Sequence, residues 1–581
     1  MIASHLRCLK SSTTPLHRLI LRNLSSAILP NPGTVVADRC NLNIIASPFP
    51  DIEEGPYPPL KEFLASNWGD RLVDKVAVTD GSTGMQRTFG EYDELAQNIA
   101  AALLHDFSIR EDSTIALFSP NHVDYLPISL AVSVTGAKLT PINPLYTRNE
   151  LSAVLQRSRS CLLIVHESRL DVAMESVIEC PLIKNIVVIT DYNHNSIPQG
   201  THSLESLKAK HQKGGIAGTK HDIHRKTETH PFLLPYSSGT TALPKGVCLT
   251  HHNLVANLLQ IGLVEDLGFP ESHKLISPLP MFHIYAYTYA LLYSAWKGHE
   301  LITMSARFDL ERFCQLVEEH KPERAHLVPP VVLALAKSPI VDKYDCSSLR
   351  QIVSAAAPLG LEVELAAKAR LGCEIKQAWG MSELSPIGTL NSDSSSKPGS
   401  VGPLCPSTHA KVVDSEGQSL PPFVDGELLI KGPQVMMGYL DDPEQTKECL
   451  SGSGWLRTGD VCHYDEDGYF FITDRLKELI KVRGYQVAPA ELEALLLTHD
   501  NIDDAAVIQI PDEASGELPR AYVVLKDGVS TTEEDIIAWV KERVAPYKRL
   551  DGGVVLTSTI PKSASGKILR RLLREQYANG T

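Results

Sequence analysis

The chain has 581 residues, more than one hydrophobic core usually organises, so the sequence predicts at least two domains. Apolar residues make up 43% and charged residues 21%, as in an ordinary globular protein, and the net charge of −14 argues against nonspecific binding to nucleic acid or to an acidic membrane surface. The 11 cysteines contain no C-x-x-C spacing, so they indicate neither a zinc cage nor a disulfide framework.

The N-terminus has the pattern of an organellar leader. Residues 1–37 contain four Lys or Arg, several Ser and Thr, and no acidic residue. From Leu16 to Ile28 the apolar residues fall four positions apart, with Arg18 and Arg22 on another face of the implied helix. The sequence therefore predicts that residues 1–40 are a transit peptide for the mitochondrial matrix. A disordered tail on a cytoplasmic protein is the alternative interpretation.

Short β-rich runs then alternate with helix-like segments. STIALFSP at 113–120 and CLLIVH at 161–166 have the composition of strands, and the segments 91–106 and 310–321 have the apolar spacing of helices. This alternation predicts an α/β fold in which sheets are layered with helices. The apolar run at 284–296 predicts a buried helix, because a bilayer span needs about 20 apolar residues.

Two polar segments interrupt this pattern. Residues 191–230 are rich in His, Lys, Gly and Asn and carry no apolar period. His221 and His224 could ligate a metal, but without Cys or carboxylate partners the segment is better explained as a solvated surface insertion. The composition of NSDSSSKPGS at 391–400 predicts a flexible loop.

Towards the C-terminus the α/β pattern restarts on a smaller scale. Pro489 suits the first position of a helix, and Thr531 with Glu534 predicts a capping box for the helix EDIIAWVKERV. The runs AAVIQI and AYVVL have the composition of strands. We therefore expect a large N-terminal domain over 43–475 and a small α+β domain over 477–581.

The stretch LPYSSGTTALPKGVCLTH at 234–251 combines small hydroxyl residues, glycine and lysine. It is not a P-loop, because Lys245 follows Pro244 and precedes Gly246 instead of Ser or Thr. The residue types still suit an anion, although a surface turn is the alternative when the stretch is taken alone. The donors, the glycine and the cation are Ser237, Ser238, Gly239, Thr240, Thr241 and Lys245.

Further motifs follow this loop in order, and together they resemble the acyl-adenylate-forming superfamily. Within it the chain is similar to 4-coumarate:CoA ligases and related acyl-CoA synthetases, over roughly residues 43–577. Besides the loop, the motifs are PMFHIYAY (280–287), VPPVVLALAKSPIVDKYD (328–345), SAAAPLG (354–360), QAWGMSELSP (377–386), GELLIKGPQVMMGYL (426–440), WLRTGD (455–460), DRLKELIKVRGYQVAPAELE (474–493) and PKSASGKILRR (561–571).

The resemblance implies an acid:CoA ligase that uses ATP, Mg²⁺ and coenzyme A. A carboxylate is a poor electrophile, so it first attacks the α-phosphate of ATP, giving an acyl-adenylate and pyrophosphate. The CoA thiolate then displaces AMP and forms the acyl-CoA. Fixed cations and donors aimed at the developing negative charge would lower the first barrier.

The resemblance also assigns nucleotide and metal positions. The 237–246 loop would hold the outer phosphates, Glu383 would bind Mg²⁺, and Asp460, supported by Arg475, would accept the ribose hydroxyls. Trp379 and the SAAAP segment would enclose adenine, and Ser382 keeps a hydroxyl where the family usually has Thr. The remaining implied nucleotide, hinge and CoA positions are Ala356, Ala357, Pro358, Gln377, Gly380, Lys477 and Gly484.

Four residues are implied to be catalytic. Lys567 would bridge the substrate carboxylate and the α-phosphate, and His283 would assist adenylation, although a lone buried His is usually structural. Lys567 occupies the place that the thiol must approach, so the C-terminal domain is expected to rotate about Lys477 between the two steps. Lys481 would serve mainly thioester formation, and Gln486 would lie near the adenylate.

Several positions depart from the family pattern. Ala242 replaces a loop glycine, which costs on the order of 1 kcal/mol if that position needs a positive φ. In the expected acyl pocket Tyr285 is kept, Ala355 and Ala378 replace glycines, and Arg307 replaces a lysine. Added methyl groups narrow a pocket and favour a slimmer aliphatic chain. The acid is therefore expected to be a medium-chain fatty acid or a hydroxycinnamate such as 4-coumarate.

Two other functions remain as alternatives. An adenylating enzyme could pass the acyl group to a carrier protein or to oxygen, and a nonenzymatic sensor could use the same scaffold. Retention of the segment VRGYQ favours CoA as the acceptor, and the full set of catalytic positions disfavours the sensor. The expected partners are the acid, ATP and CoA, with no nucleic acid and no transmembrane segment, and the oligomeric state is not predicted.

Overall fold

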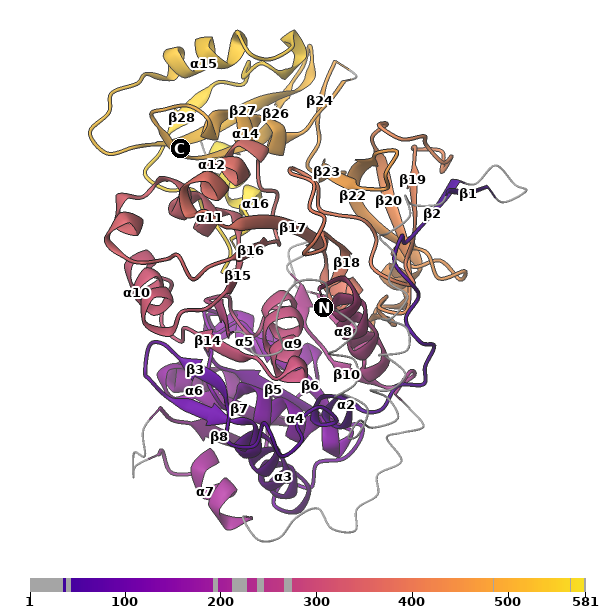
Figure 1. The fold of residues 1–581 in the computed structure, drawn as a ribbon, viewed down its shortest axis with the longest axis vertical. Coiled ribbons are helices and arrows are strands. Elements are labelled where there is room, and N and C mark those ends of the chain that lie inside the picture. Colours follow the sequence, from indigo (N-terminus) through magenta and orange to yellow (C-terminus); the bar gives the residue numbers. More distant parts are fainter. Residues whose placement is uncertain are drawn as a thin grey trace, which may run out of the picture.

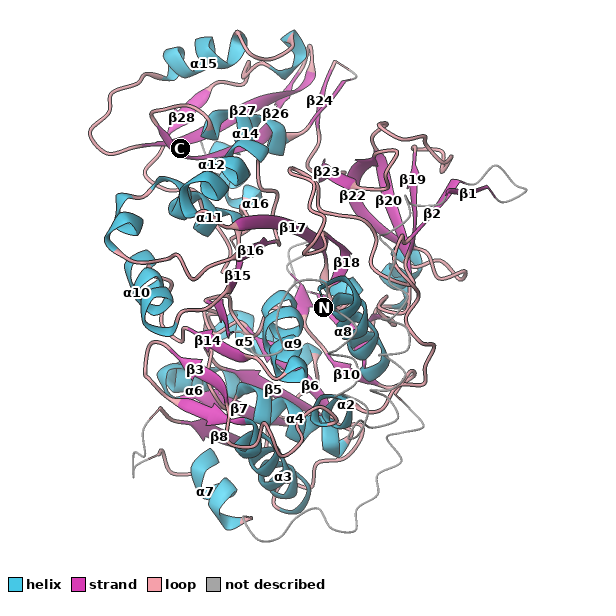
Figure 2. Cartoon of the chain, viewed as in Figure 1, coloured by secondary structure: helices cyan, strands magenta, loops and turns pink. Residues whose placement is uncertain are grey.

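The computed structural model describes residues 35–37, 43–191, 197–211, 227–237, 245–265, 274–483, 485–564 and 566–578 of the 581 residues. Within these ranges the strands form four sheets, and helices pack over them (Figures 1 and 2). The α/β class predicted from the alternation of strands and helices is confirmed.

Two sheets form the centre of the N-terminal part, and most of their neighbouring strands run parallel. In the described residues, the first has the order β11 (Tyr236–Ser237), β12 (Lys245–Thr250), β10 (Pro231–Leu233), β6 (Lys138–Ile142), β5 (Thr114–Phe118), β7 (Leu162–His166), β8 (Asn185–Ile189), β9 (His202–Ser203), and β21 (Gly438–Tyr439) pairs with β12. The second has the order β18 (Ile387–Leu390), β17 (Glu374–Gly380), β16 (Gln351–Ser354), β15 (Arg324–Leu327), β13 (Lys274–Ser277), β14 (Glu300–Thr303), β3 (Val76–Asp80), β4 (Gln86–Thr88).

The two other sheets are antiparallel for the most part. Over the same described ranges, one has the order β1 (Val35–Ala37), β2 (Asn43–Ala46), β19 (His409–Val413), β20 (Gly426–Lys431), β22 (Leu456–Tyr464), β23 (Phe470–Arg475). The C-terminal sheet has the order β25 (Tyr485–Val487), β24 (Ile480–Val482), β27 (Gly516–Leu525), β26 (Ile502–Asp512), and β28 (Val554–Leu556) pairs with β27.

Helices cover the faces of these sheets, as Figure 2 shows. The α-helices are α2 (Leu60–Ala65), α3 (Phe89–His105), α4 (Tyr125–Thr135), α5 (Arg148–Arg157), α6 (Leu170–Val177), α7 (Leu204–Lys210), α8 (His251–Glu265), α9 (Tyr293–Lys297), α10 (Leu310–His320), α11 (Pro329–Lys337), α12 (Leu361–Leu371), α13 (Pro443–Cys449), α14 (Pro489–Leu497), α15 (Glu533–Lys541) and α16 (Arg570–Ala578). The short 3-10 helices are η2 (Glu167–Arg169), η5 (Pro339–Lys343), η6 (Ser382–Leu384) and η7 (Pro546–Lys548), and η4 (Tyr285–Leu292) is a π-helix.

The strands predicted from composition and the helices predicted from apolar spacing are confirmed. The segments at 113–120 and 161–166 contain β5 and β7, and every residue of these two strands is buried, as expected for strands covered on both faces. The segments at 91–106 and 310–321 contain α3 and α10. Asp309 caps α10, its carboxylate accepting a hydrogen bond from the backbone N–H of Arg312 at 2.7 Å.

The apolar run at 284–296 forms η4 followed by α9, and all residues of η4 are buried. The prediction of a buried helix is therefore confirmed, with π rather than α geometry over its first part. Among the described residues, no helix is both long and apolar enough to span a lipid bilayer.

Three sequence predictions need correction. The capping box of α15 is formed by Thr532 and Asp535, one position later than predicted, because the Thr531 hydroxyl already accepts a hydrogen bond from Asn501 at 2.8 Å. The loop 391–400 is anchored rather than flexible at its ends. Asn391 is buried and donates to the carbonyl of Ser400 at 2.7 Å, so its polar side chain is satisfied inside the protein.

The third correction concerns the segment 191–230. Its described part contains β9 and α7, and Leu204 and Leu207 of α7 are buried, so this part is built into the fold. A helix this short carries too few apolar positions for a period to be seen in the sequence. His221 and His224 lie outside the described residues.

Two separate hydrophobic clusters form the larger cores. One runs from Ile45 to Phe470, and another lies between Ile480 and Val554 in the C-terminal sheet and its helices. The C-terminal part lies over α11 and α12 in Figure 1. Direct hydrogen bonds join the two parts, since Lys337 Nζ donates to the carbonyl of Leu497 at 3.0 Å.

Candidate nucleotide and acyl site

The predicted nucleotide residues gather at the carboxyl ends of β16 and β17. These two strands are parallel neighbours, so the turn that follows β16 and the end of β17 meet at the same edge of the sheet. The turn contains Ala356, Ala357 and Pro358 of the SAAAP motif. Ala356 has φ of 76°, a left-handed conformation that is costly for a residue with a Cβ. The protein therefore holds this turn in a fixed, strained shape beside the expected adenine site.

Trp379, Asp460 and Arg475 are joined by direct contacts. The indole Nε1 of Trp379 donates to Asp460 Oδ2 at 2.8 Å, and Arg475 Nε lies 3.4 Å from Asp460 Oδ1. The register of β22 and β23 places Asp460 opposite Arg475. Asp460 is 7% exposed, so its carboxylate is held in place by donors on two sides. The structure thus brings together three residues predicted from separate motifs.

Glu383 lies next to this group, in η6. Its carboxylate accepts a hydrogen bond from Tyr439 at 2.8 Å, and Lys245 Nζ lies 5.0 Å from the centre of the Tyr439 ring. β21, which carries Tyr439, pairs with β12, which begins at Lys245. Tyr439 was missed by sequence reasoning, although it stands in the quoted motif GELLIKGPQVMMGYL. A buried carboxylate oxygen at this position fits a Mg²⁺ ligand.

Gly380 and Ser382 form the link between β17 and η6. A Cβ on Gly380 would lie 2.0 Å from the carbonyl oxygen of Pro386, so only glycine fits this position. Ser382 is the first residue of η6. This close approach of two backbone segments aims Glu383 towards Tyr439.

The predicted phosphate loop is described at its two ends. Ser237 ends β11 and pairs through its backbone with Lys245, the first residue of β12. Ser238, Gly239, Thr240, Thr241 and Ala242 lie outside the described residues, and so does Gly484. The described ends of the predicted loop are therefore paired as neighbours on two antiparallel strands.

Lys567 enters this site from the C-terminal domain. Burial, and to a smaller extent the charge of Arg475, lowers the pKa of Lys567 to about 8, while the charges of Asp460 and Glu383 oppose this shift. Burial, together with the charge of Lys567, lowers the pKa of His283 to about 3, so this imidazole is neutral. The structure therefore brings a C-terminal lysine together with four residues of the N-terminal domain.

Lys481 and Gln486 are arranged differently. They lie opposite each other on β24 and β25, and both are exposed. Lys477 is also exposed, in the segment between β23 and β24. In this arrangement of the two domains, Lys567 faces the nucleotide residues while the hairpin that carries Lys481 and Gln486 faces solvent.

The predicted acyl residues are partly brought together. Tyr285 in η4 is buried and donates from its hydroxyl to the carbonyl of Val353 in β16 at 3.1 Å. Ala355 and Ala378 are buried at the ends of the adjacent strands. Arg307 is exposed in the segment between β14 and α10. The side chain of Gln377 points to α12, where Nε2 donates to Glu364 at 2.7 Å.

A separate group of side chains has the composition of a metal site. His122, His166 and Asp191 place one ligand atom each within 4.8 Å of one another. However, Nδ1 of each imidazole accepts a backbone N–H, from Asp124 and Ser168, which leaves the proton on Nε2. Metal-binding imidazoles donate from the ring nitrogen that does not bind the metal. These three residues are therefore better explained as a hydrogen-bonded group than as a metal site. In it, His166 Nε2 donates to Asp191 Oδ1 at 3.1 Å.

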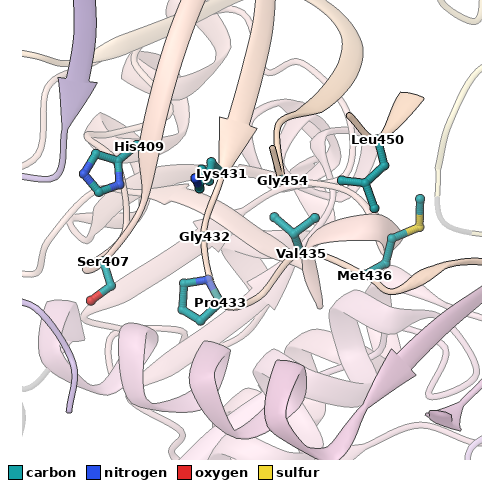
Figure 3. A pocket seen from close by; sticks show the side chains of 9 residues that line it. All are labelled: Ser407, His409, Lys431, Gly432, Pro433, Val435, Met436, Leu450 and Gly454. Carbon is teal, nitrogen blue, oxygen red and sulfur yellow. The ribbon is translucent and has the colours of Figure 1, made fainter. Parts of the chain in front are cut away.

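A surface hollow of about 490 Å³ lies elsewhere, around the end of β20 (Figure 3). The residues that line it are Ser407, His409, Lys431, Gly432, Pro433, Val435, Met436, Leu450 and Gly454. It shares no lining residue with the predicted nucleotide or acyl residues, so it does not define where ATP or the acid binds.

The fold and these contacts define an adenylate-forming enzyme, and comparison with known proteins agrees. Residues 66–440 match the AMP-binding enzyme family, and residues 491–567 match the AMP-binding enzyme C-terminal domain. The chain is 38% identical to 4-coumarate–CoA ligase 1 of Petroselinum crispum over 559 residues, which covers 94% of this chain and 99% of that protein.

Solved structures agree with this assignment. The anthranilate CoA ligase AuaEII in complex with anthranoyl-AMP superposes with a TM-score of 0.83 at 25% identity, covering 91% of this chain and 99% of that one. A benzoate CoA ligase from Burkholderia xenovorans LB400 gives a TM-score of 0.77 at 25% identity, over 89% and 100% of the two chains. The chain belongs to the AMP-binding enzyme family, as the ordered motifs predict.

Proposed function

We propose that this chain, an ATP-dependent and AMP-forming acid:CoA ligase, acts on a hydroxycinnamate such as 4-coumarate or on a medium-chain fatty acid. The relatives named 4-coumarate–CoA ligase support an aromatic acid. The burial of Tyr285 beside Ala355 and Ala378 supports a narrow pocket. ATP, Mg²⁺ and CoA are the cosubstrates and cofactor of the reaction.

In the first step the acid carboxylate attacks the α-phosphorus of ATP, and the bond from phosphorus to the pyrophosphate oxygen breaks. Lys567 would neutralise charge on the carboxylate and α-phosphate oxygens, and Lys245 would do so for the departing pyrophosphate. Asp460 would hold the ribose hydroxyls. Glu383 would hold Mg²⁺, which supplies positive charge to the phosphate oxygens. His283, which is neutral, would orient the carboxylate by hydrogen bonding.

In the second step the CoA thiol releases its proton to solvent and its sulfur attacks the acyl carbonyl carbon. The bond from that carbon to the AMP phosphate oxygen then breaks, and AMP leaves. Lys567 occupies the adenylation site in the present arrangement, so it must withdraw before the thiol can approach. A rotation at Lys477 would remove it and bring the exposed Lys481 and Gln486 towards the adenylate.

The observation that carries this proposal is the position of Lys567 among Glu383, Asp460, Arg475 and His283. We expect Lys567→Ala to abolish acid-dependent exchange between ATP and pyrophosphate while partly preserving the conversion of synthetic acyl-AMP and CoA to thioester. Lys541→Ala, at an exposed lysine of α15, is the matched control and should preserve both reactions. Equal loss in both assays with Lys567→Ala would refute the role given to this lysine.

The acid is identified by mass spectrometry of products from purified enzyme with ATP, Mg²⁺, CoA and a panel of acids. The panel runs from short and long fatty acids to hydroxycinnamates. Preference for one class fixes the acyl substrate. Formation of acyl-AMP without a thioester would mean that CoA is the wrong acceptor.

We further propose that residues 1–40 direct the protein to the mitochondrial matrix. The support is the basic, acid-free, amphipathic pattern of this segment. Fusion of residues 1–40 to a fluorescent reporter should send the reporter to mitochondria. A diffuse cytosolic signal would contradict the proposal.

A further inference from the structure

Four charged side chains lie together in the core beside the candidate acyl pocket. They are Glu265 at the end of α8, Arg324 in β15, Lys376 in β17 and Asp393 after β18, and we call them the ionic cluster. Their side chains are 0–2% exposed. Lys376 Nζ lies 2.5 Å from Glu265 Oε1 and 2.7 Å from Asp393 Oδ1. Arg324 pairs with Glu265 and with Asp393, the latter at 2.9 Å.

Strand register places the ionic cluster directly behind the predicted acyl residues. Side chains two residues apart on a strand point to the same face, so Lys376 shares a face with Ala378. His326 pairs with Val353, and Val353 pairs with Lys376, across parallel strands that Figure 1 shows side by side. Lys376 therefore lies roughly 7 Å back along β17 from Ala378, away from the nucleotide edge of the sheet.

The helix η4, which covers this face of the sheet, places its side chains in the same order as the strands. Tyr285 contacts Val353 through its hydroxyl, at the level of the predicted acyl residues. Tyr289 lies one turn further along η4, and the centre of its ring is 4.5 Å from the centre of the His326 ring. Its hydroxyl donates a hydrogen bond to Glu265. The predicted nucleotide residues lie at the carboxyl ends of β16 and β17. Going from that edge into the core, one meets first Tyr285, next Tyr289 with His326, and last the ionic cluster.

Stability alone gives no reason for the ionic cluster. Removing charges from water is costly, and well-packed apolar residues of similar volume often serve a core as well as a buried ion pair. Burial lowers the pKa of Lys376 to about 7, and the negative charge of Asp393 opposes this shift. Gln351 also donates to Asp393 at 3.0 Å, so the carboxylate is fixed by three donors. Such a satisfied cluster is rigid and cannot yield to an entering group without leaving charges unpaired.

We propose that the ionic cluster is the end wall of the acyl pocket and restricts this ligase to compact acids, so that it selects a hydroxycinnamate over a medium-chain fatty acid. This inference rests on the proposed function. An aliphatic tail that extended past Tyr289 would meet buried charges with which it can make no hydrogen bond. A compact aromatic acid ends before them, and a hydroxyl on its distal side would meet the polar layer of Tyr289 and His326.

The first test uses the unmodified enzyme. Acid-dependent exchange of pyrophosphate into ATP is measured with 4-coumarate and with saturated acids from butanoate to dodecanoate. We expect kcat/KM for octanoate and longer acids to be at least about tenfold below that for 4-coumarate. Equal or higher values for decanoate would overturn the end wall but leave the ligase function intact. Failure of every acid in the panel would instead refute the proposed function.

The second test shortens the end wall without leaving a lone charge. The double variant Lys376→Ala with Asp393→Asn removes one cation and one anion and keeps the pair of Arg324 with Glu265. It should raise kcat/KM for decanoate about tenfold or more, while that for 4-coumarate changes much less. Unchanged preference in a folded double variant would overturn the proposal, and if that variant does not fold, the chain-length series with the unmodified enzyme decides.

A matched control is available in another part of the core. Lys208 and Asp124 form a buried pair at 2.9 Å, with side chains 6% and 0% exposed, and Arg87 contacts Asp124 as Arg324 contacts Asp393. Lys208→Ala with Asp124→Asn removes the same charges outside the candidate site. This control variant should leave the ratio of kcat/KM for decanoate to kcat/KM for 4-coumarate unchanged. A change in the ratio as large as that of the test variant would mean that general loosening, rather than the end wall, controls chain length.

Discussion

The hydrogen bond between Trp379 and Asp460 links the expected adenine site to the expected ribose site. Trp379→Phe keeps an aromatic ring and removes one donor from a buried carboxylate. A hydrogen bond to a charged group contributes about 1.5–3 kcal/mol, so we expect KM for ATP to rise about tenfold or more while KM for the acid changes little. Steady-state kinetics with each substrate varied will check this.

Trp455→Phe is the matched control for this change. Trp455 packs under Lys411, whose Nζ lies 4.5 Å from the ring centre, and it is not among the predicted site residues. Its replacement should leave KM for ATP unaltered. If Trp379→Phe also leaves it unaltered, Asp460 does not depend on the indole for its orientation.

The pKa of Lys567 gives the adenylation step a pH dependence. The step needs the ammonium form, and burial lowers the pKa of Lys567 to about 8 in the protein without substrate. We therefore expect kcat/KM for ATP to fall as the pH rises through about 8. Bound phosphates favour the ammonium, so kcat should fall only at higher pH. Pyrophosphate exchange measured from pH 6 to 10 will test this.

The control for the pH profile is the second half-reaction. Thioester formation from synthetic acyl-AMP does not need Lys567 in the site, so the loss near pH 8 should be absent from that reaction. If both half-reactions lost rate near pH 8, a group other than Lys567 would be responsible for the titration.

At the level of elements, the connection between β17 and η6 links the residues predicted to lie beside adenine to the predicted metal ligand Glu383. Gly380→Ala would force a Cβ to within 2.0 Å of the carbonyl oxygen of Pro386, and a backbone atom cannot move aside cheaply. We expect the midpoint of thermal unfolding to fall by several degrees. Gly69→Ala, where a Cβ would meet no atom within 4 Å, should leave the midpoint nearly unchanged. Equal midpoints for the two variants would contradict the close approach at Gly380.

Some elements and site residues could be predicted from the sequence, and others could not. The strands β5 and β7 were predictable because each is a short, continuous β-rich run, and the helices α3 and α10 because their apolar residues recur at the helical period. The motifs predict a shared site for Trp379, Asp460 and Lys567, and the structure brings these three residues together. Lys376 and Asp393 could not be placed, because a charge in a strand and an acid in a Ser-rich loop both suggest exposure. Their pairing with each other, and with Glu265 and Arg324, explains why they are buried.

At the level of the whole molecule, contacts at two places hold the two domains in one arrangement. Lys337 donates to the carbonyl of Leu497, and a Cβ on Gly566 would lie 3.2 Å from Val328. These contacts keep Lys567 inside the adenylation site. If the hairpin of Lys481 and Gln486 serves thioester formation, as the resemblance implies, these contacts would have to break before the second half-reaction.

The resemblance implies that the domains rotate at Lys477, so a proline at this position would block the motion. Lys477→Pro fixes φ near −65° and restricts the preceding residue, so it limits rotation between β23 and β24. We expect pyrophosphate exchange to be largely preserved and thioester formation from synthetic acyl-AMP to fall about a hundredfold. Lys477→Ala removes the side chain but leaves the backbone free, so it should preserve both reactions. If Lys477→Pro forms the thioester at the normal rate, rotation at this residue is not required and the domains must separate elsewhere.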